Sequence, residues 1–297
     1  MKTRTPSLLA LAFLLTLPLS ISCIHVIDAP YKVSETKKEV LLFRKDGRSH
    51  LIIRTGITGL SGAKGLAWVI PLPDTPLKVS EEPATLFPAL YALVPDKENV
   101  TPLALRIIPS CSAVPMNYRA IRVHEPETTE HFTTQVIDIR QEGAAEVLNA
   151  WLTSRGFGPV PAANQQYYLK PGRSFLCVRV TRMPKDGTLQ IPPLHLEWSM
   201  PVLEFPLKFS SHSGVFDADL YVLSKGEIPR AAFDPWSLKR VGSRELDEAK
   251  LKQIAPQFAG AGLVLTRFSG HRFNSPRHRV MDLDSDPSIA VTTLEAD

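Results

Sequence analysis

Two histidines and three glutamates lie within eight residues, from His124 to His131. Imidazole nitrogens and carboxylate oxygens are ligands that zinc and other divalent cations bind in proteins. The set expected to share one ion is His124, Glu127 and His131. The spacing is not the His-Glu-x-x-His of helical zinc sites, and Pro126 prevents a helix from aligning the ligands. A solvated loop between two strands explains the same residues, so both interpretations are open.

A second polar group lies near the C-terminus, where four arginines are interleaved with histidines and phenylalanines. Guanidinium groups bind phosphate and other anions, either on a lipid or on a polyanionic wall polymer. The pattern predicts an anion site formed by Arg267, Arg272, Arg277 and Arg279. The alternative is a solvated strand and turn that the acidic residues from Asp282 onward balance.

The remaining nucleophiles do not form a catalytic pattern. In the segment Ser210–Gly214, Ser211 and His212 are adjacent, and adjacent side chains on an extended chain point to opposite faces. The sequence has neither a Gly-x-Ser-x-Gly elbow nor a phosphate-binding glycine loop. We therefore predict no catalytic residue and no cofactor, and the sequence favours a non-enzymatic role.

The first residues have the pattern of a secretory signal. Lys2 and Arg4 precede an apolar run over residues 8–15, which is too short to span a bilayer. Residues 1–22 are the expected signal peptide, because Ser20 and Ser22 suit an ordinary signal peptidase. Alternatively, Cys23 carries the lipid of a lipoprotein, although Ser20 departs from the leucine-like residue of such signals. The predicted location is the periplasm, the outer envelope surface or the medium, with or without a lipid anchor.

The three cysteines are Cys23, Cys111 and Cys177. An exported chain meets an oxidising compartment, and a lipid on Cys23 would leave Cys111 and Cys177 as a disulfide pair. The apolar neighbours of Cys177 equally fit a buried free thiol.

The formal net charge of +4 includes Lys2 and Arg4 of the signal. A charge this small does not predict nucleic-acid binding. The expected partner is an unidentified envelope component or protein, with membrane contact only through a lipid on Cys23.

Strand patterns dominate the chain. Asp46-Gly47 between two apolar runs predicts a hairpin over residues 39–58. Apolar spacing of three and four predicts helices over 82–94, 142–154 and 245–258, and residues 159–163 have the composition of a linker. The expected fold class is α+β, with a mainly antiparallel sheet and a few packed helices. Further strands are expected over 65–73, 103–108, 119–123, 133–139, 173–182, 194–198, 203–209, 219–223 and 263–268.

Several blocks of this sequence resemble a bacterial family of exported proteins known as domain of unknown function 2330. The resemblance runs from Cys23 to Gly226 and implies export and a shared fold, but no activity. It rests mainly on apolar, Pro and Gly positions: Leu66–Pro73, Leu86-Phe87, Val136-Ile137-Asp138, Leu148, Trp151-Leu152, Gly156-Phe157, Tyr168, Gly172, Ser174-Phe175, Val178, Pro193-Leu194, Pro206-Leu207 and Leu220–Leu223.

The expected organisation is a signal peptide over 1–22, a main domain over 23–226, a helix-strand extension over 227–281 and a flexible acidic tail over 282–297. The favoured function is binding or scaffolding by an exported or lipid-anchored envelope protein. The alternative is a metal-assisted hydrolase that acts on an envelope or extracellular substrate.

Overall fold

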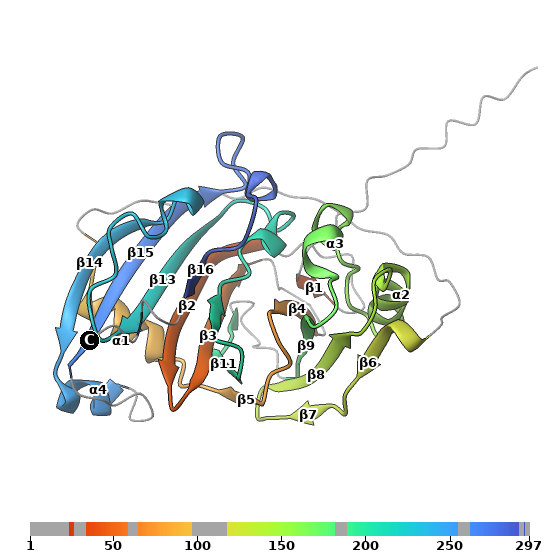
Figure 1. Cartoon of the computed structure of the whole chain (residues 1–297), viewed down its shortest axis with the longest axis horizontal. Coiled ribbons are helices and arrows are strands. Elements are labelled where there is room, and N and C mark those ends of the chain that lie inside the picture. Colours follow the sequence, from red (N-terminus) through yellow and green to blue (C-terminus); the bar gives the residue numbers. More distant parts are fainter. Residues whose placement is uncertain are drawn as a thin grey trace, which may run out of the picture.

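The computed structural model describes residues 24–26, 34–58, 65–96, 118–181, 189–254, 262–290 and 294. Strands predominate in it, and two sheets lie next to each other with the helices around them (Figure 1). Among the described pairs of strands, only β2 with β13 is parallel. The prediction of a strand-rich chain with mainly antiparallel sheets is therefore confirmed.

The larger sheet is built around the predicted hairpin. Asp46 and Gly47 both have positive φ, 50° and 73°, which is the backbone geometry that a two-residue turn between twisted strands requires. The order of this sheet is β14 (Lys239–Leu246), β15 (Leu263–Phe273), β13 (Phe216–Ser224), β2 (Ser34–Lys45), β3 (Arg48–Thr58), β11 (Leu194–Trp198) and β5 (Lys78–Glu81), and β10 (Leu189–Gln190) also pairs with β3.

The smaller sheet has β4, a fully buried strand, near its centre. Its order is β1 (Ile24–Val26), β4 (Leu66–Leu72), β9 (Ser174–Val180), β8 (Phe132–Ile139) and β6 (Ile121–Val123), and β7 (Glu127–Thr128) also pairs with β8. A separate two-stranded sheet joins β12 (Val202–Glu204) to β16 (Ser288–Ala290).

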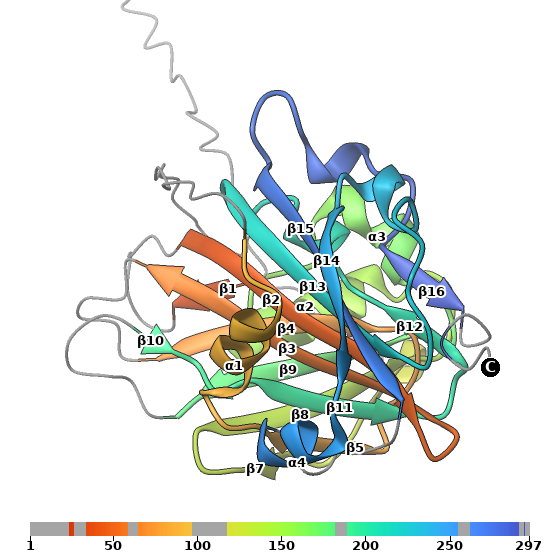
Figure 2. The same cartoon turned by 90° about the vertical axis from the view of Figure 1, so that its left-hand side faces the viewer.

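Both faces of the larger sheet are buried at its central strands, which explains the continuous apolar runs there. Side chains alternate along a strand. Val40 and Leu42 of β2 belong to a core that includes Trp68 of β4, so this core joins the two sheets. Leu41 and Phe43 belong to a second core on the opposite face. The second core is covered by α1 (Leu86–Leu93), seen in front of the sheet in Figure 2, and by α4 (Glu248–Ile254).

Two further helices pack on the core that joins the sheets. The predicted helix over 142–154 is α2 (Ala145–Ser154), and Gly156 has a φ of 75° just beyond its end. The linker expected over 159–163 is wrong in part, because α3 (Ala162–Tyr168) begins there. Apolar spacing did not reveal α3, whose fully buried Tyr168 packs edge-on against Phe209.

The boundary predicted at residue 226 does not separate two units. Strands β14 and β15 of the expected extension continue the larger sheet beside β13. The helix expected from residue 245 begins only at Glu248, and the strand expected over 203–209 ends at Glu204 and is followed by the 3-10 turn η2 (Lys208–Ser210). The strand expected over 103–108 lies outside the described residues.

The expectation of a flexible tail is also wrong for residues 282–290. This segment follows the 3-10 turn η5 (Val280–Asp282) and ends in β16, which pairs with β12. Asp286 is buried, and its carboxyl group accepts hydrogen bonds from Tyr168 Oη at 2.5 Å and from the Lys208 backbone at 2.6 Å. Burial raises the pKa of Asp286, and these bonds give partners to a polar side chain that composition alone places in solvent. None of the helices in the described part of the chain has the length and apolar character needed to cross a membrane.

Candidate functional site

The chain crosses from the smaller sheet to the larger one between β4 and β5. Strand β5 is the edge strand of the larger sheet and pairs with β11. Two groups of hydrogen bonds tie the crossing segment to the smaller sheet, one at Thr75 and one at Glu81.

The first group centres on Asp138 of β8. Its Oδ1 accepts hydrogen bonds from Thr75 Oγ1 at 2.8 Å and from Ser174 Oγ at 3.0 Å, and its Oδ2 lies 2.8 Å from His124 Nε2. Burial by itself would raise the pKa of Asp138, but hydrogen bonds from these three side chains hold it below its ordinary value. Asp138 is therefore a charged acceptor at neutral pH and fixes the orientation of the His124 ring.

The second group centres on Glu81, the last residue of β5. One carboxylate oxygen accepts from the His131 backbone at 2.8 Å and from Thr129 Oγ1, and the other lies 2.8 Å from His131 Nδ1. Burial would raise the pKa of Glu81, whereas the bonds from Thr129 and His131 lower it below its ordinary value. The turn between β7 and β8 is thereby fixed to the edge of the larger sheet.

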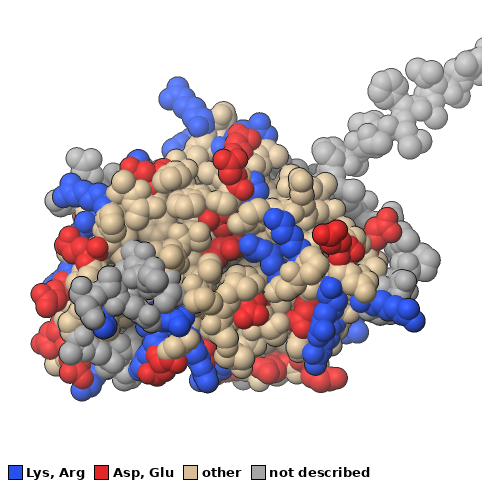
Figure 3. Space-filling model, in the orientation of Figure 1, with Lys and Arg blue, Asp and Glu red and all other residues tan. Residues whose placement is uncertain are grey.

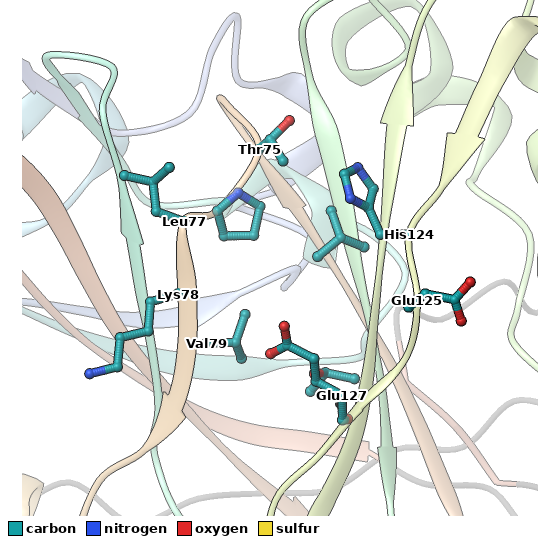
Figure 4. Close-up of a pocket in the computed structure, with 10 residues that line it drawn as sticks. Thr75, Leu77, Lys78, Val79, His124, Glu125 and Glu127 are labelled. Carbon is teal, nitrogen blue, oxygen red and sulfur yellow. Dashed lines mark hydrogen bonds between the residues drawn. The ribbon is translucent and has the colours of Figure 1, made fainter.

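A cavity of about 80 Å³, which we call the β5 pocket, adjoins these two groups. Figure 4 shows the Glu127 carboxylate directed toward Val79 across the pocket, while the Lys78 ammonium and the Glu125 carboxylate point away. The lining consists of residues 75–79 on one side and of His124, Glu125, Glu127, Thr134 and Val136 on the other.

The predicted metal ligands do not share one site. His124 and Glu127 line the β5 pocket, but His131 does not and is bonded to Glu81. Within the described ranges, no group of three or more His, Cys, Asp or Glu is placed to hold a metal ion. The predicted ligand set is therefore wrong, because β5 supplies each end of the His124–His131 segment with a separate partner.

The predicted anion site loses one member. Arg267 is 1% exposed and bonds Asp219 on the face of the sheet that α1 covers. Arg272, Arg277 and Arg279 are exposed near the end of β15 and in the turn that follows it, and an anion site formed by these three stays a prediction. Over the face in Figure 3, Lys and Arg are interspersed with Asp and Glu.

Cys177 of β9 is a free, buried thiol. Burial raises its pKa well above the ordinary value, so it is a poor nucleophile. This agrees with the interpretation of a core thiol and not with a Cys111–Cys177 disulfide. Cys111 and Cys23, the candidate lipidation site, lie outside the described residues.

Three polar side chains form a hydrogen-bonded chain on the face of the larger sheet that points away from the smaller sheet. The sequence analysis did not predict this chain. His195 Nδ1 lies 2.9 Å from Glu82 Oε1, and His195 Nε2 lies 3.0 Å from His50 Nδ1. Phe43 stacks on the His50 ring with a centroid distance of 4.5 Å. Glu81, at the end of β5, bonds His131 on one face of the larger sheet, and the next residue, Glu82, bonds His195 on the other. These two adjacent residues therefore connect the polar groups of the two faces.

Some sequence signals could have revealed these residues. Asp138 is a single carboxylate within the apolar run Val136–Ile139, and a charge in such a run is buried with partners or functional. The pair Glu81-Glu82 next to Pro83 has no such signal, since its partners are 50 and 113 residues away in the sequence.

Neither a family model nor a curated protein matches this sequence. Among solved structures, the chain is similar to the caspase-8/P35 complex, at 8% identity over 86% of this chain and 96% of that chain, with a TM-score of 0.44. It is also similar to baculovirus P35, at 10% identity over 72% of this chain and 74% of that chain, with a TM-score of 0.42. Likeness at this level carries no argument about fold or function, and the resemblance to the exported family stays a prediction.

Proposed function

We propose that this protein is exported to the cell envelope and binds a partner there through the β5 pocket, without catalysing a reaction. The observation that carries the proposal is that hydrogen bonds at Asp138 and Glu81 hold the walls of the pocket in place. A site whose groups are already oriented loses less entropy when a ligand binds.

The rim of the pocket also offers apolar surface. Leu77 lines the pocket and is 56% exposed, and the other large apolar side chain exposed among the described residues is Met200, at 37%. An exposed leucine next to polar groups is typical of a contact surface when it borders a cavity.

The histidines favour binding over metal-assisted hydrolysis. A catalytic zinc site has three protein ligands and an open coordination position. Here His131 makes two hydrogen bonds to Glu81, and His124 is bonded to Asp138. Both rings thus hold protein segments together, which favours binding over metal-assisted hydrolysis.

Export is supported by Lys2, Arg4 and the apolar run over residues 8–15. The test is the intact mass of the protein purified from the native envelope fraction. We expect a chain that begins at Cys23, with diacylglyceryl and acyl groups if it is a lipoprotein and without them if it is secreted. A chain that retains Met1–Ser22 and remains in the cytoplasmic fraction would contradict export.

Binding is tested by co-sedimentation of the protein with purified envelope fragments of the producing cell. We expect the wild type and a Met200→Asp variant to sediment with the fragments and a Leu77→Asp variant to stay in solution. Both substitutions place a charge at an exposed apolar side chain, but only Leu77 lines the pocket. Equal sedimentation of both variants would place the contact elsewhere, and a wild type that stays in solution would refute envelope binding.

A further inference from the structure

We infer that the β5 pocket binds an alkylammonium group, meaning a short aliphatic chain that ends in a protonated amine. A lysine side chain and a small free amine share this chemistry. The inference rests on the proposed binding function and adds the class of ligand.

The charge inside the pocket is negative. Of the charged side chains that line it, the Glu127 carboxylate points into it, whereas the Lys78 ammonium points away. The Glu127 side chain makes no ion pair or hydrogen bond with other residues in the described part of the chain. A carboxylate that faces a cavity without a partner attracts a cation and repels an anion.

The His124 imidazole, on the same side of the pocket as Glu127, adds an acceptor. The carboxylate of an ionised Asp138 can only accept hydrogen bonds. The His124 nitrogen that faces it, Nε2, must therefore carry a proton and donate. When the ring is neutral, this bond leaves Nδ1 as an acceptor. A ligand with several N–H donors matches an acceptor and a carboxylate better than a hydroxyl or a carbonyl does.

The apolar part of the lining suits a methylene chain. Pro76, Leu77, Val79 and Val136 all line the pocket, and Val79 faces the Glu127 carboxylate. Long cationic side chains bury their methylene stems on apolar surface while the charged head finds polar partners. A bare metal ion would gain nothing from this wall and would need more ligands than Glu127 and His124.

The size of the cavity limits the ligand. A water molecule needs about 10–15 Å³ of such space, so 80 Å³ accommodates a few waters or one short chain. Sugars, nucleotides and other ligands of drug size occupy cavities of roughly 300–1,000 Å³. The pocket thus fits the end of one side chain or a small amine.

The test is NMR titration of the full exported chain with n-butylamine, n-butanol and butyrate at equal ionic strength. These probes share a four-carbon chain and differ in the charge of the head group. We expect saturable shifts of the His124 ring signals with n-butylamine, at roughly millimolar affinity for so small a ligand. Binding of n-butanol should be at least about tenfold weaker, and butyrate should not bind. Equal binding of n-butanol and n-butylamine would overturn the inference.

Two glutamate variants provide the matched comparison. Glu127→Gln removes the inward carboxylate and should weaken n-butylamine binding by about tenfold or more. Glu142→Gln removes an exposed carboxylate that does not line the pocket, and its affinity should equal that of the wild type. Similar affinities of the two variants would show that Glu127 does not recognise the amine.

The source of the amine follows from a second titration. Tighter binding of N-acetyl-lysine methylamide than of putrescine would identify a protein side chain, and the reverse order would identify a free diamine. If envelope fragments bind and Leu77→Asp abolishes that binding, but n-butylamine does not bind, this inference fails and the proposed function stands. If n-butylamine binds and envelope fragments do not, the proposed function fails and the amine site stands.

Discussion

The β5 pocket and the region around Arg267 use the same kinds of charged residue in opposite ways. Arg267, on β15, lies 2.7 Å from Asp219, which also bonds Lys37 at 2.6 Å. Arg267 also bonds Asp96, just beyond α1, and its guanidinium lies 4.6 Å from the Tyr91 ring centroid of that helix. We call these residues the Arg267 network, in which each charge faces an opposite charge.

The β5 pocket is only partly neutralised. Asp138 and Glu81 are fully engaged by their hydrogen-bond donors, whereas Glu127 faces the cavity. Buried charges that satisfy one another fix a local structure, and removing one partner leaves the other uncompensated. A charge beside a cavity can instead interact with a ligand. The comparison assigns a structural role to the first region and a binding role to the second.

The largest expected effect comes from Arg267→Met. The substitution leaves Lys37 as the cationic partner of Asp219 in the network. It also removes the ion pair between Asp96 and Arg267 of β15. The free energy of unfolding in urea should fall by about 3–5 kcal/mol. The exposed Arg272→Ala is the control and should change it by no more than about 0.5 kcal/mol. Equal stabilities of the two variants would refute the structural role of the network.

The next effect in size comes from Asp138→Asn. The amide cannot accept from Thr75, Ser174 and His124 as the carboxylate does, so unfolding free energy at pH 7 should fall by about 1–3 kcal/mol. The variant should also weaken n-butylamine binding, since His124 is no longer oriented. Arg267→Met should leave that binding unchanged, and a loss of binding there would remove the distinction between the two regions.

The pH dependence of this difference has a definite sign. The pKa of Asp138 is lowered on folding, so its stabilisation is present above the unfolded value of about 3.9 and is lost as pH falls through the folded value. The stability gap between the wild type and Asp138→Asn should therefore close below about pH 4. A gap that is constant from pH 7 to pH 3 would show that hydrogen bonds to the ionised form do not stabilise the fold.

Sequence patterns predicted the parts of the fold that depend on neighbouring residues. The Asp46-Gly47 turn and β4 follow from local turn chemistry and apolar runs. Strand β14 was not predicted because few of its side chains are apolar, and its place depends on pairing with β15. Such pairing is fixed by the tertiary structure and not by local propensity.

The candidate site was predicted only in part for the same reason. His124 and Glu127 were identified because they lie in a short polar cluster, but their partners come from distant strands. Arg267 was grouped with the later arginines, although its position in the middle of β15 places it under α1. Identifying buried and exposed charges required the sheet order, which no single segment contains.

The smallest effect concerns His50, in the chain from Glu82 through His195. Burial, together with the nearby charge of His195, lowers the pKa of His50. The unfolded chain therefore takes up this proton at a higher pH, near 6.5, and the native state loses stability as pH falls from that value toward the folded pKa. This titration changes the unfolding free energy by at most about 1.4 kcal/mol per pH unit, which is the value for one proton.

His50→Phe preserves an aromatic ring next to Phe43 and removes this titration. Unfolding free energy measured in urea from pH 7 to pH 5 should then fall less steeply than in the wild type. Because His50 lies on the opposite face of the sheet from the core that joins the two sheets, its loss should not alter n-butylamine binding at pH 7. An unchanged slope would show that the His50–His195 pair does not sense pH. Weakened amine binding would show that β5 transmits changes between the two faces of the larger sheet. The pocket would then depend on the Glu82–His195–His50 chain on the other face.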